Sequence, residues 1–486
     1  MGIDPLNIAV QGLNAAQRGI GVVAQNVANA STPGYTRKTL QQYSVYAGDQ
    51  GAGVVTGGLT RDVNTNLQSS LWAQNSVSGS SQTSESYLNQ LQQLFGTPDS
   101  DSSFAGALTS VQNDFVSLDS DPSNNVLQSQ VVNDAEDLTN KINSLAQNIQ
   151  GLRTNAVSDL SSTVGQVNQL LSQVASLNTQ IAKATNTGQD VVDLQDQRDL
   201  SVNQLSQYMN ISTYIGSDGT MTVSTATGTL LADTQAQTLS YTSTPVTAQS
   251  YYPASINGIM VGGTDITSQI TSGTMGSLIS LRDTSLPQAQ AMLDETAQKL
   301  ASRFSAQNVK LFTDASGNVP ANTPTTYAGF SSTIQINPAV LADPTLLQKG
   351  TAGGTFNASD NTNIQNVLNY AFGANSNASG TPNTPFNTTG LGPGGNLSIN
   401  MPASGPIVNF ANNVISTLSE QYSQASSDST YQTNYQNTLQ KNMLDSSGVS
   451  VDTEMSNLIQ LQNAYGANAK IITSVQQMFT ELLQTI

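Results

Sequence analysis

The sequence predicts a mainly α-helical, multidomain α+β protein with β-rich insertions, and three observations support this fold class. Apolar residues recur at helical spacing near both ends of the chain, and again over about 60 residues in its first half. Two other stretches are rich in Gly, Thr, Asn and Pro and contain short alternating segments. We therefore expect a rod-like domain of long helices, coiled-coil-like helices at both ends, and one or two β-rich inserted domains.

The first 38 residues contain a predicted helix and the turn that ends it. Apolar residues follow one another in steps of three, four or their multiples, which places them on one stripe of the helix. Pro33 and Gly34 stop the helix and favour a turn. We predict that the stripe forms one half of a polymerisation interface, made of Ile3, Leu6, Val10, Leu13, Ile20 and Val27.

The C-terminal stretch contains the second predicted terminal helix. Its apolar residues are spaced close to 3.5 residues apart on average, which is the coiled-coil repeat. One amphipathic terminal helix usually packs on its own domain, whereas one at each end favours assembly through the termini. We expect the terminal helices to be disordered or loosely attached until neighbouring subunits bury them. The second half of the predicted interface is Val451, Met455, Leu458, Leu461, Tyr465, Ile472, Val475, Phe479 and Leu482.

Between the ends, helical and β regions alternate. Apolar residues from Leu127 to Ile181 predict a helix, or a pair of helices, of about 60 residues and about 90 Å, with a break near Gly151 or Gly165. A further helix is predicted over Val192–Tyr208. The expected domains are a terminal polymerisation domain (1–38 and 446–486), a rod-like helical domain (39–210, 278–310 and 407–445), and outward-facing β-rich insertions (211–277 and 311–406).

Composition excludes several classes of function. The chain has no Cys and no His, which removes disulfides, the usual zinc and haem ligands, and Ser-His-Asp triads. Residues 119–124 begin like a calcium loop but lack its turn Gly and closing Glu, and read better as a helix start capped by Asp121. We expect no catalysis, no metal and no cofactor. A net charge of −17 makes nucleic acid or an anionic membrane an unsuitable partner.

The sequence shows no secretory signal and no membrane span. Residues 1–30 lack a basic start and an unbroken apolar core, and no stretch approaches the roughly 18 apolar residues of a membrane helix. These features alone are typical of a cytoplasmic protein.

Both ends carry motifs that resemble a known family. Gln11–Gln17 followed by Asn26–Tyr35 resembles the N-terminal signature of the bacterial flagellar rod, hook and hook-associated proteins. Met455–Lys470 is similar to their C-terminal signature, although Gly466 stands where the family more often has a strong helix former.

The middle of the chain resembles the hook-associated members of that family. Rod and hook proteins are mostly β between their ends, whereas this chain has a long helical middle. Asp121–Gln130, Asp193–Leu200 and Leu286–Asp294 are similar to hook-associated proteins. Arg198, within the second of these, is either on a solvated helix face with a local ion pair or in contact with a neighbouring helix or subunit.

The resemblance implies a structural protein of the flagellum that joins hook to filament. Its implied partners are further copies of itself, the hook protein, a second junction protein, and a cytoplasmic export chaperone on the C-terminal helix. It also implies export by the flagellar type III apparatus without signal cleavage. Two alternatives remain open: another axial protein of the rod or hook type, and a secreted carbohydrate-binding adhesin or hydrolase.

Overall fold

The computed structural model describes residues 5–47, 50–97, 100, 102–353 and 357–484, and its contacts group them into two compact units. The terminal unit comprises the described residues within Met1–Ser78, Gln166–Thr238 and Gln432–Ile486. The central unit comprises those within Gly79–Gly165 and Leu239–Tyr431. The three-part division expected from the sequence stays a prediction, because it concerns assembly as well as packing within one chain.

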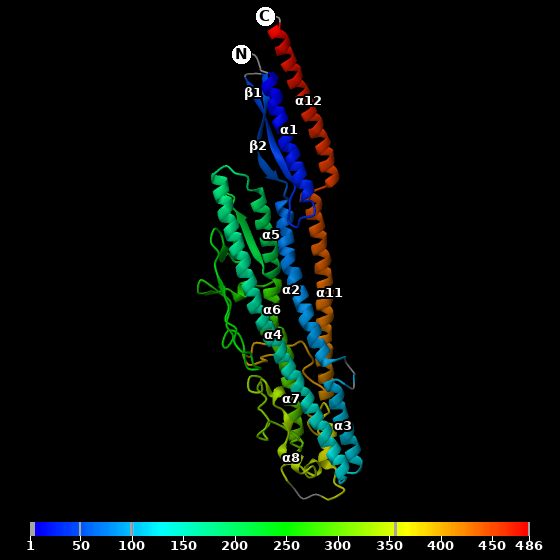
Figure 1. The fold of residues 1–486 in the computed structure, drawn as a ribbon. Coiled ribbons are helices and arrows are strands. Elements are labelled where there is room, and N and C mark those ends of the chain that lie inside the picture. The colour runs from blue at the N-terminus through cyan, green and yellow to red at the C-terminus, as the bar shows by residue number, and fades with distance from the viewer. Residues whose placement is uncertain (1–4, 48–49, 98–99, 101, 354–356, 485–486) are drawn as a thin grey trace. The chain divides into compact units, whose positions relative to one another are not determined.

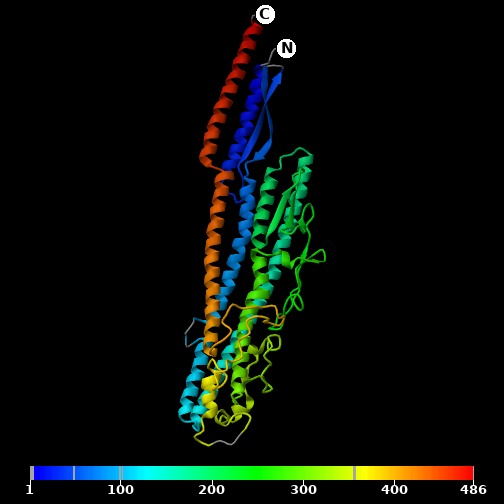
Figure 2. The same ribbon diagram turned by 180° about the vertical axis from the view of Figure 1, so that it is seen from behind.

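In the terminal unit, the two ends of the chain form an antiparallel helix pair. Helix α1 (Pro5–Ala28) contacts helix α12 (Val451–Gln484) along its length and a β-hairpin elsewhere on its surface (Figures 1 and 2). The hairpin pairs β1 (Lys38–Ala47) with β2 (Gln50–Arg61). Residues 38–47 and 50–61 form this hairpin because β-branched and Gly residues there favour extended pairing over a helix.

The remainder of the terminal unit packs a small sheet on helices. Asn178 of α4 donates from Nδ2 to the backbone oxygens of Met221 and Asp233, both at 2.7 Å, and so fastens the sheet to the helix. Three helices contribute residues to both units. The further elements are α2 (Thr65–Phe95), α4 (Asn125–Asn186), α5 (Val192–Tyr208), α11 (Ile407–Ser447), and the antiparallel strands β3 (Ile211–Ile215), β4 (Met221–Thr225) and β5 (Leu230–Ala232).

The long helices confirm the periodicity argument, with three corrections. Helix α4 runs from Asn125 to Asn186 without the expected break, since its glycines face open space and only weaken the helix. Its N-terminus is capped by Asn124, whose Oδ1 accepts from the backbone N–H of Val126 at 3.0 Å, and not by Asp121. Apolar spacing predicts two helical stretches, at about 407–425 and 431–444, and these form one continuous helix, α11. Helix α5 has the predicted bounds.

In the central unit, a continuous helical stretch passes through a wide turn. Its α-helices α6 and α7 are joined by the π-helix η2, in which the N–H of Leu286 bonds to the oxygen of Leu281. The irregular turn lies directly before Pro287, which lacks a backbone N–H and would clash in a regular helix interior. The elements are α3 (Phe104–Ser120), α6 (Gly273–Ser280), η2 (Leu281–Ser285), α7 (Leu286–Ala306), β6 (Leu239–Ser240), β7 (Met260–Val261), β8 (Thr264–Asp265) and η1 (Thr267–Gln269).

Residues 311–406 differ from the expected outward-facing β domain. Their described part has only two-residue strands, and it supplies core side chains: Phe312 and Phe372 pack edge-to-face on Phe304, with ring centroids 5.0 and 5.2 Å apart. The segment therefore contributes to the core of the central unit, and its outward placement in an assembly stays a prediction. Its elements are β9 (Phe312–Thr313), η3 (Phe330–Ser332), β10 (Gln335–Ile336), α8 (Pro338–Ala342), α9 (Leu346–Lys349), α10 (Thr362–Asn366) and η4 (Val367–Ala371).

Candidate assembly surface of the terminal helices

Small residues set the distance between α1 and α12. A Cβ atom added to Gly12 would lie 2.7 Å from Asn468 Nδ2, and one added to Gly19 would lie 3.0 Å from Leu461 Cδ2. Close approach of two helices requires such positions to lack a side chain. The buried face of α1 is accordingly built mostly from small side chains: Ala9, Ala15, Ala16 and Gly19, with Val23 and Asn26.

The predicted interface residues divide by exposure in this pair. Ile3 lies outside the described residues. The larger apolar residues between the helices are half-buried, whereas others face outward, so that the pair covers only part of both stripes. Half-buried are Leu6, Leu13, Ile20, Val27, Leu458, Leu461, Ile472 and Val475; exposed are Val10, Val451, Met455, Tyr465, Phe479 and Leu482.

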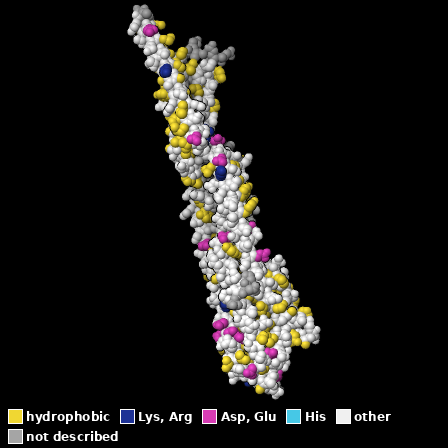
Figure 3. Space-filling model, turned by 90° about the vertical axis from the view of Figure 1, so that its right-hand side faces the viewer, with side chains coloured by type: hydrophobic (Ala, Val, Ile, Leu, Met, Phe, Trp, Pro, Cys, Tyr) yellow, Lys and Arg dark blue, Asp and Glu magenta, His cyan; other side chains and the backbone are white. Residues whose placement is uncertain are grey.

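The exposed apolar surface continues beyond the predicted residues. Ile459, Ile471, Met478 and Leu483 of α12 are also exposed, the last by 74%. Figure 3 shows hydrophobic side chains gathered along the terminal helices on the face that it presents. The strict 3.5-residue spacing omitted these neighbours, although each is an apolar residue in a helix with few charges. A contiguous apolar surface of this kind is typical of a protein interaction site.

The hairpin adds a further exposed surface to the unit. Tyr43, Val45, Tyr46 and Val55 are large apolar side chains that face outward from β1 and β2. Arg18 Nη1 donates to Thr56 Oγ1 at 2.6 Å and fixes the hairpin on α1. Apolar spacing in the sequence does not indicate this surface, because the Gly-rich second strand has few large side chains.

At the C-terminal end of α1, the side chain of Asn26 forms hydrogen bonds that hold the following turn in place. Its Nδ2 donates to the backbone oxygen of Lys38 at 2.9 Å and to Glu454 Oε2 at 3.2 Å. Its Oδ1 accepts from the hydroxyl of Tyr35 at 3.0 Å and from the N–H of Lys38 at 3.1 Å. Arg37 Nε lies 2.8 Å from Glu454 Oε1, so the start of α12 is fastened to the same turn. Burial, with the charges of Asp196 and Glu454, raises the pKa of Tyr35 to about 12.

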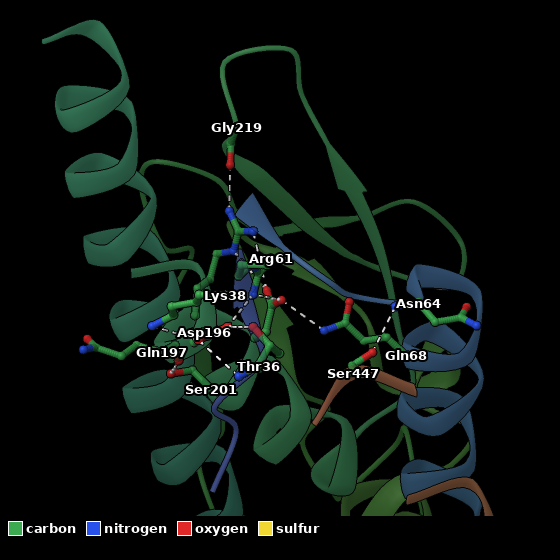
Figure 4. Close-up of polar contacts among 12 residues, drawn as sticks. Thr36, Lys38, Arg61, Asn64, Gln68, Asp196, Gln197, Ser201, Gly219 and Ser447 are labelled. Atoms are coloured by element: carbon green, nitrogen blue, oxygen red, sulfur yellow. Dashed lines mark hydrogen bonds and ion pairs between the residues drawn. The ribbon is translucent and has the colours of Figure 1, made fainter. Parts of the chain in front are cut away.

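A buried cluster of charges connects this turn and the hairpin to α5 (Figure 4). Lys38 is 1% exposed and pairs with Asp193 and Asp196. Arg61 Nη1 lies 2.9 Å from both Asp196 Oδ1 and Asp199 Oδ2. Burial lowers the pKa of Lys38, and the charge of Asp196 opposes that shift. Lys38 and Arg61 both contact Asp196, so removing that carboxylate would take a partner from two largely buried cations at once.

Arg198 resolves the alternatives left open by the sequence. It is 1% exposed, and its Nη1 donates to the backbone oxygen of Gly219 at 2.7 Å and to Asn178 Oδ1 at 3.3 Å. It therefore contacts a neighbouring helix and the β3–β4 turn of its own chain. Burial lowers the pKa of Arg198, with Asp199 opposing.

The hydrogen bonds of Asn26 and the ion pairs at α5 hold the turn and the hairpin in fixed positions beside α1. Within the part of the chain that the structure describes, acidic side chains nowhere gather in a group of three or more fit for a metal ion. The described helices also include none that is both long and apolar enough to cross a membrane. The ion pairs of Lys38 and Arg61 with α5 link separate secondary-structure elements and fix the geometry of the turn.

Comparisons with known protein families match a segment near the N-terminus, a long middle segment and a segment near the C-terminus. Residues 88–322 match the family described as flagellar hook-associated protein FlgK helical domain. Residues 440–485 match the flagellar basal body rod FlgEFG protein C-terminal family, and residues 6–36 match the flagella basal body rod protein family. These two terminal matches cover α1 with the turn that follows it at one end and α12 at the other.

Full-length relatives agree with the family matches. Flagellar hook-associated protein 1 of Salmonella typhimurium is 26% identical over 323 residues, which is 64% of this chain and 58% of that protein. The Bacillus subtilis protein of the same name is 25% identical over 98% of this chain and 97% of its own. A solved structure of the flagellar hook junction protein FlgK from Burkholderia pseudomallei aligns over 52% of this chain and 45% of its own, with 27% identity and a TM-score of 0.43. The chain thus spans little more than half the length of the Salmonella relative.

Proposed function

We propose that this chain is a member of the flagellar hook-associated protein family and a structural subunit that joins hook to filament. The observation that carries the proposal is the apolar surface left uncovered on the terminal helices, at the segments that resemble the terminal signatures of axial proteins. Burying such side chains against neighbouring subunits stabilises an assembly by about 1.5–3 kcal/mol for each large side chain.

We expect several partner proteins to bind the exposed apolar surface of the terminal helices. Further copies of this chain, the hook protein and a second junction protein would each cover part of it in the assembled flagellum. A cytoplasmic chaperone would cover the apolar residues of α12 before export, since an exposed surface of this size favours aggregation. Export without signal cleavage, through the flagellar type III apparatus, is the route that the family implies.

A structural role also accounts for the side chains that are present. Two basic residues of the terminal unit, Lys38 and Arg61, are held in ion pairs with α5. Such contacts orient the hairpin and the turn after α1 relative to α5. We infer that the protein acts by assembly and not by catalysis.

Electron microscopy of cells that lack the protein tests the proposal. Hooks should be present, filaments absent, and flagellin released into the medium. Filaments of normal length in these cells would contradict the junction role, and would favour an adhesin or hydrolase.

A matched pair of variants tests the surface itself. Phe479→Asp places a charge on an exposed apolar position of α12 and should abolish filament formation, while Gln476→Asp places the same charge on an exposed polar position and should not. Equal motility of the two strains would show that the apolar surface is not the one used in assembly.

A further inference from the structure

The central unit buries a lysine and a glutamate that have no part in the assembly surface. Lys299 and Glu295 lie one turn apart on α7, with side chains only 1% and 0% exposed, and their Nζ and Oε1 atoms are 3.6 Å apart. Burying such a pair costs free energy unless further hydrogen bonds compensate. The hydrogen-bond partners of the two side chains therefore show how the pair is stabilised and which reaction its position permits.

The side-chain amide of Asn322 lies against the amine of Lys299. Lys299 Nζ donates to Asn322 Oδ1 at 2.9 Å, and Asn387 Nδ2 donates to the same oxygen at 2.9 Å. Gln298 Nε2 donates to the backbone oxygen of Pro320 at 3.2 Å and holds this loop on α7. Two donors on one carbonyl oxygen withdraw electron density from the amide carbon, which is the atom that an amine attacks.

Glu295 is held in position to exchange protons with that amine. Its Oε1 accepts from the backbone N–H of Asn387 at 2.7 Å. Its Oε2 accepts from Asn387 Nδ2 at 3.2 Å and from the hydroxyl of Tyr327. Burial lowers the pKa of Lys299, and Arg303 adds to that shift while Glu295 opposes it. A buried lysine with a lowered pKa is an activated nucleophile, and a neighbouring carboxylate is its proton acceptor.

We propose that Lys299 and Asn322 form an intramolecular isopeptide bond, with Glu295 as the proton carrier. Glu295 takes a proton from the ammonium group, and the neutral Nζ attacks Cγ of Asn322 to form a C–N bond. The electrons of the C=O bond move to Oδ1, where Asn387 Nδ2 stabilises them.

The intermediate then collapses and the bond between Cγ and Nδ2 of Asn322 breaks. Glu295 transfers protons from Nζ to the departing nitrogen, which leaves as ammonium, and Glu295 returns to its carboxylate form. The products are one amide and one ammonium ion, and the reaction needs no oxidant, metal or cofactor. The short distances between the groups replace the activation that an enzyme would otherwise supply.

The new bond would link α7 covalently to the segment that follows it. Such a cross-link restricts the unfolded chain and so stabilises the central unit. This inference is independent of the proposed function, because it concerns a site in the central unit and holds or fails whatever the protein assembles with.

Mass spectrometry of the purified full-length chain tests the proposal directly. The intact mass should be lower than the sequence mass by one ammonia molecule. Trypsin should fail to cut after Lys299, because its amine is acylated, and a peptide of residues 283–303 should be joined to one of residues 311–349. An unreduced mass together with full cleavage after Lys299 would overturn the proposal.

Variants assign the roles within the cluster. Asn322→Ala changes an exposed residue and should fold, but should regain the full mass and be cut after Lys299. Glu295→Gln should abolish the bond in the same way, whereas Lys310→Arg, which removes a lysine outside the cluster, should retain it. A bond that persists in Glu295→Gln would overturn the role of the carboxylate, and one that persists in Asn322→Ala would overturn the choice of Asn322.

Discussion

The side chain of Asn26 donates a hydrogen bond of 3.2 Å to Glu454, which lies 428 positions further along the chain. Through this contact the end of α1, the turn after it and the start of α12 share one buried polar group. Glu454 is 1% exposed and also pairs with Arg37. The two ends of the chain are therefore fixed in register at this point, with the apolar faces of the helices extending away from it.

We expect Asn26→Ala to loosen the turn and the start of α12 together. The change removes partners from the N–H and oxygen of Lys38 and from Glu454, and a buried polar group left without a partner costs about 1–3 kcal/mol. Hydrogen exchange at residues 36–38 and 452–456 should become faster by about tenfold or more. Asn14→Ala, at an exposed position of α1, should leave these rates unchanged. Equal protection in both variants would contradict this role for Asn26.

We expect Gly19→Val to separate α1 from α12, while Gly21→Ala is tolerated. A Cβ at Gly19 would lie 3.0 Å from a methyl group of Leu461, whereas a Cβ at Gly21 has no atom within 4 Å among the described residues. Replacing an open helical Gly by Ala stabilises the helix by about 1 kcal/mol. Filament assembly in cells should be lost only in Gly19→Val. A strain carrying Gly19→Val that swims normally would show that close helix packing is not required.

Periodicity predicted the long helices because large apolar residues mark their buried faces. Leu138, Ile142, Leu145 and Ile149 of α4 follow steps of three and four, and all are buried. Apolar spacing did not indicate the tightest contact of α1, since its buried face is made mostly of Ala and Gly, which carry little hydrophobic signal. Several large apolar residues of the terminal helices stay exposed in this pair, and their use in assembly stays a prediction.

Irregular segments and distant ion pairs could not be predicted in this way. Phe312 and Phe372 complete the core of the central unit from loops and short elements, where no repeat connects them to their neighbours. Lys38 and its partner Asp193 are 155 positions apart, and nothing in either local sequence indicates the other. The resemblance of both segments to one family was the only signal that could have placed them in the same site.

We expect a carboxyl pair between α3 and α4 to make the central unit less stable as the pH rises. Burial, a hydrogen bond to Asp134 and the charge of Asp134 raise the pKa of Asp114 from 3.8 to about 7. Because the folded state holds the proton of Asp114 more tightly than the unfolded chain does, protonation stabilises the folded state. This stabilisation is complete below the ordinary pKa of 3.8 and is lost as the pH rises through the folded-state pKa of about 7. The Tm of the wild type should therefore fall relative to that of Asp114→Asn between about pH 5 and about pH 8.

A second carboxylate provides the control for this pH effect. Asp137 is exposed on α4, so Asp137→Asn should keep the pH dependence of the wild type. If Asp114→Asn and Asp137→Asn show the same change of Tm with pH, Asp114 is not the titrating group.

We expect deletions within residues 311–406 to differ sharply in effect. Removing the whole segment would expose Phe304, which packs on Phe312 and Phe372, and large cavities of this kind cost several kcal/mol each. Removing only the exposed residues 377–380 should leave the Tm within a few °C of the wild type. A soluble, cooperatively unfolding protein after the larger deletion would show that the segment is a separate module.

We expect brief trypsin treatment of the monomer to cut first at Arg18 and Lys470 and later at Lys38. Arg18 and Lys470 are exposed on the terminal helices, and the helix pair buries mainly small side chains, so little free energy opposes its opening. Lys38 is 1% exposed and paired with Asp193 and Asp196, so cutting there requires the cluster beside α5 to open as well. Asp196→Asn, which weakens that cluster without touching α1 or α12, should bring cleavage at Lys38 forward and leave cleavage at Arg18 unchanged. Resistance of Arg18 and Lys470 equal to that of the central unit would mean that the terminal helices are already firmly packed in the monomer, and that assembly does not order them.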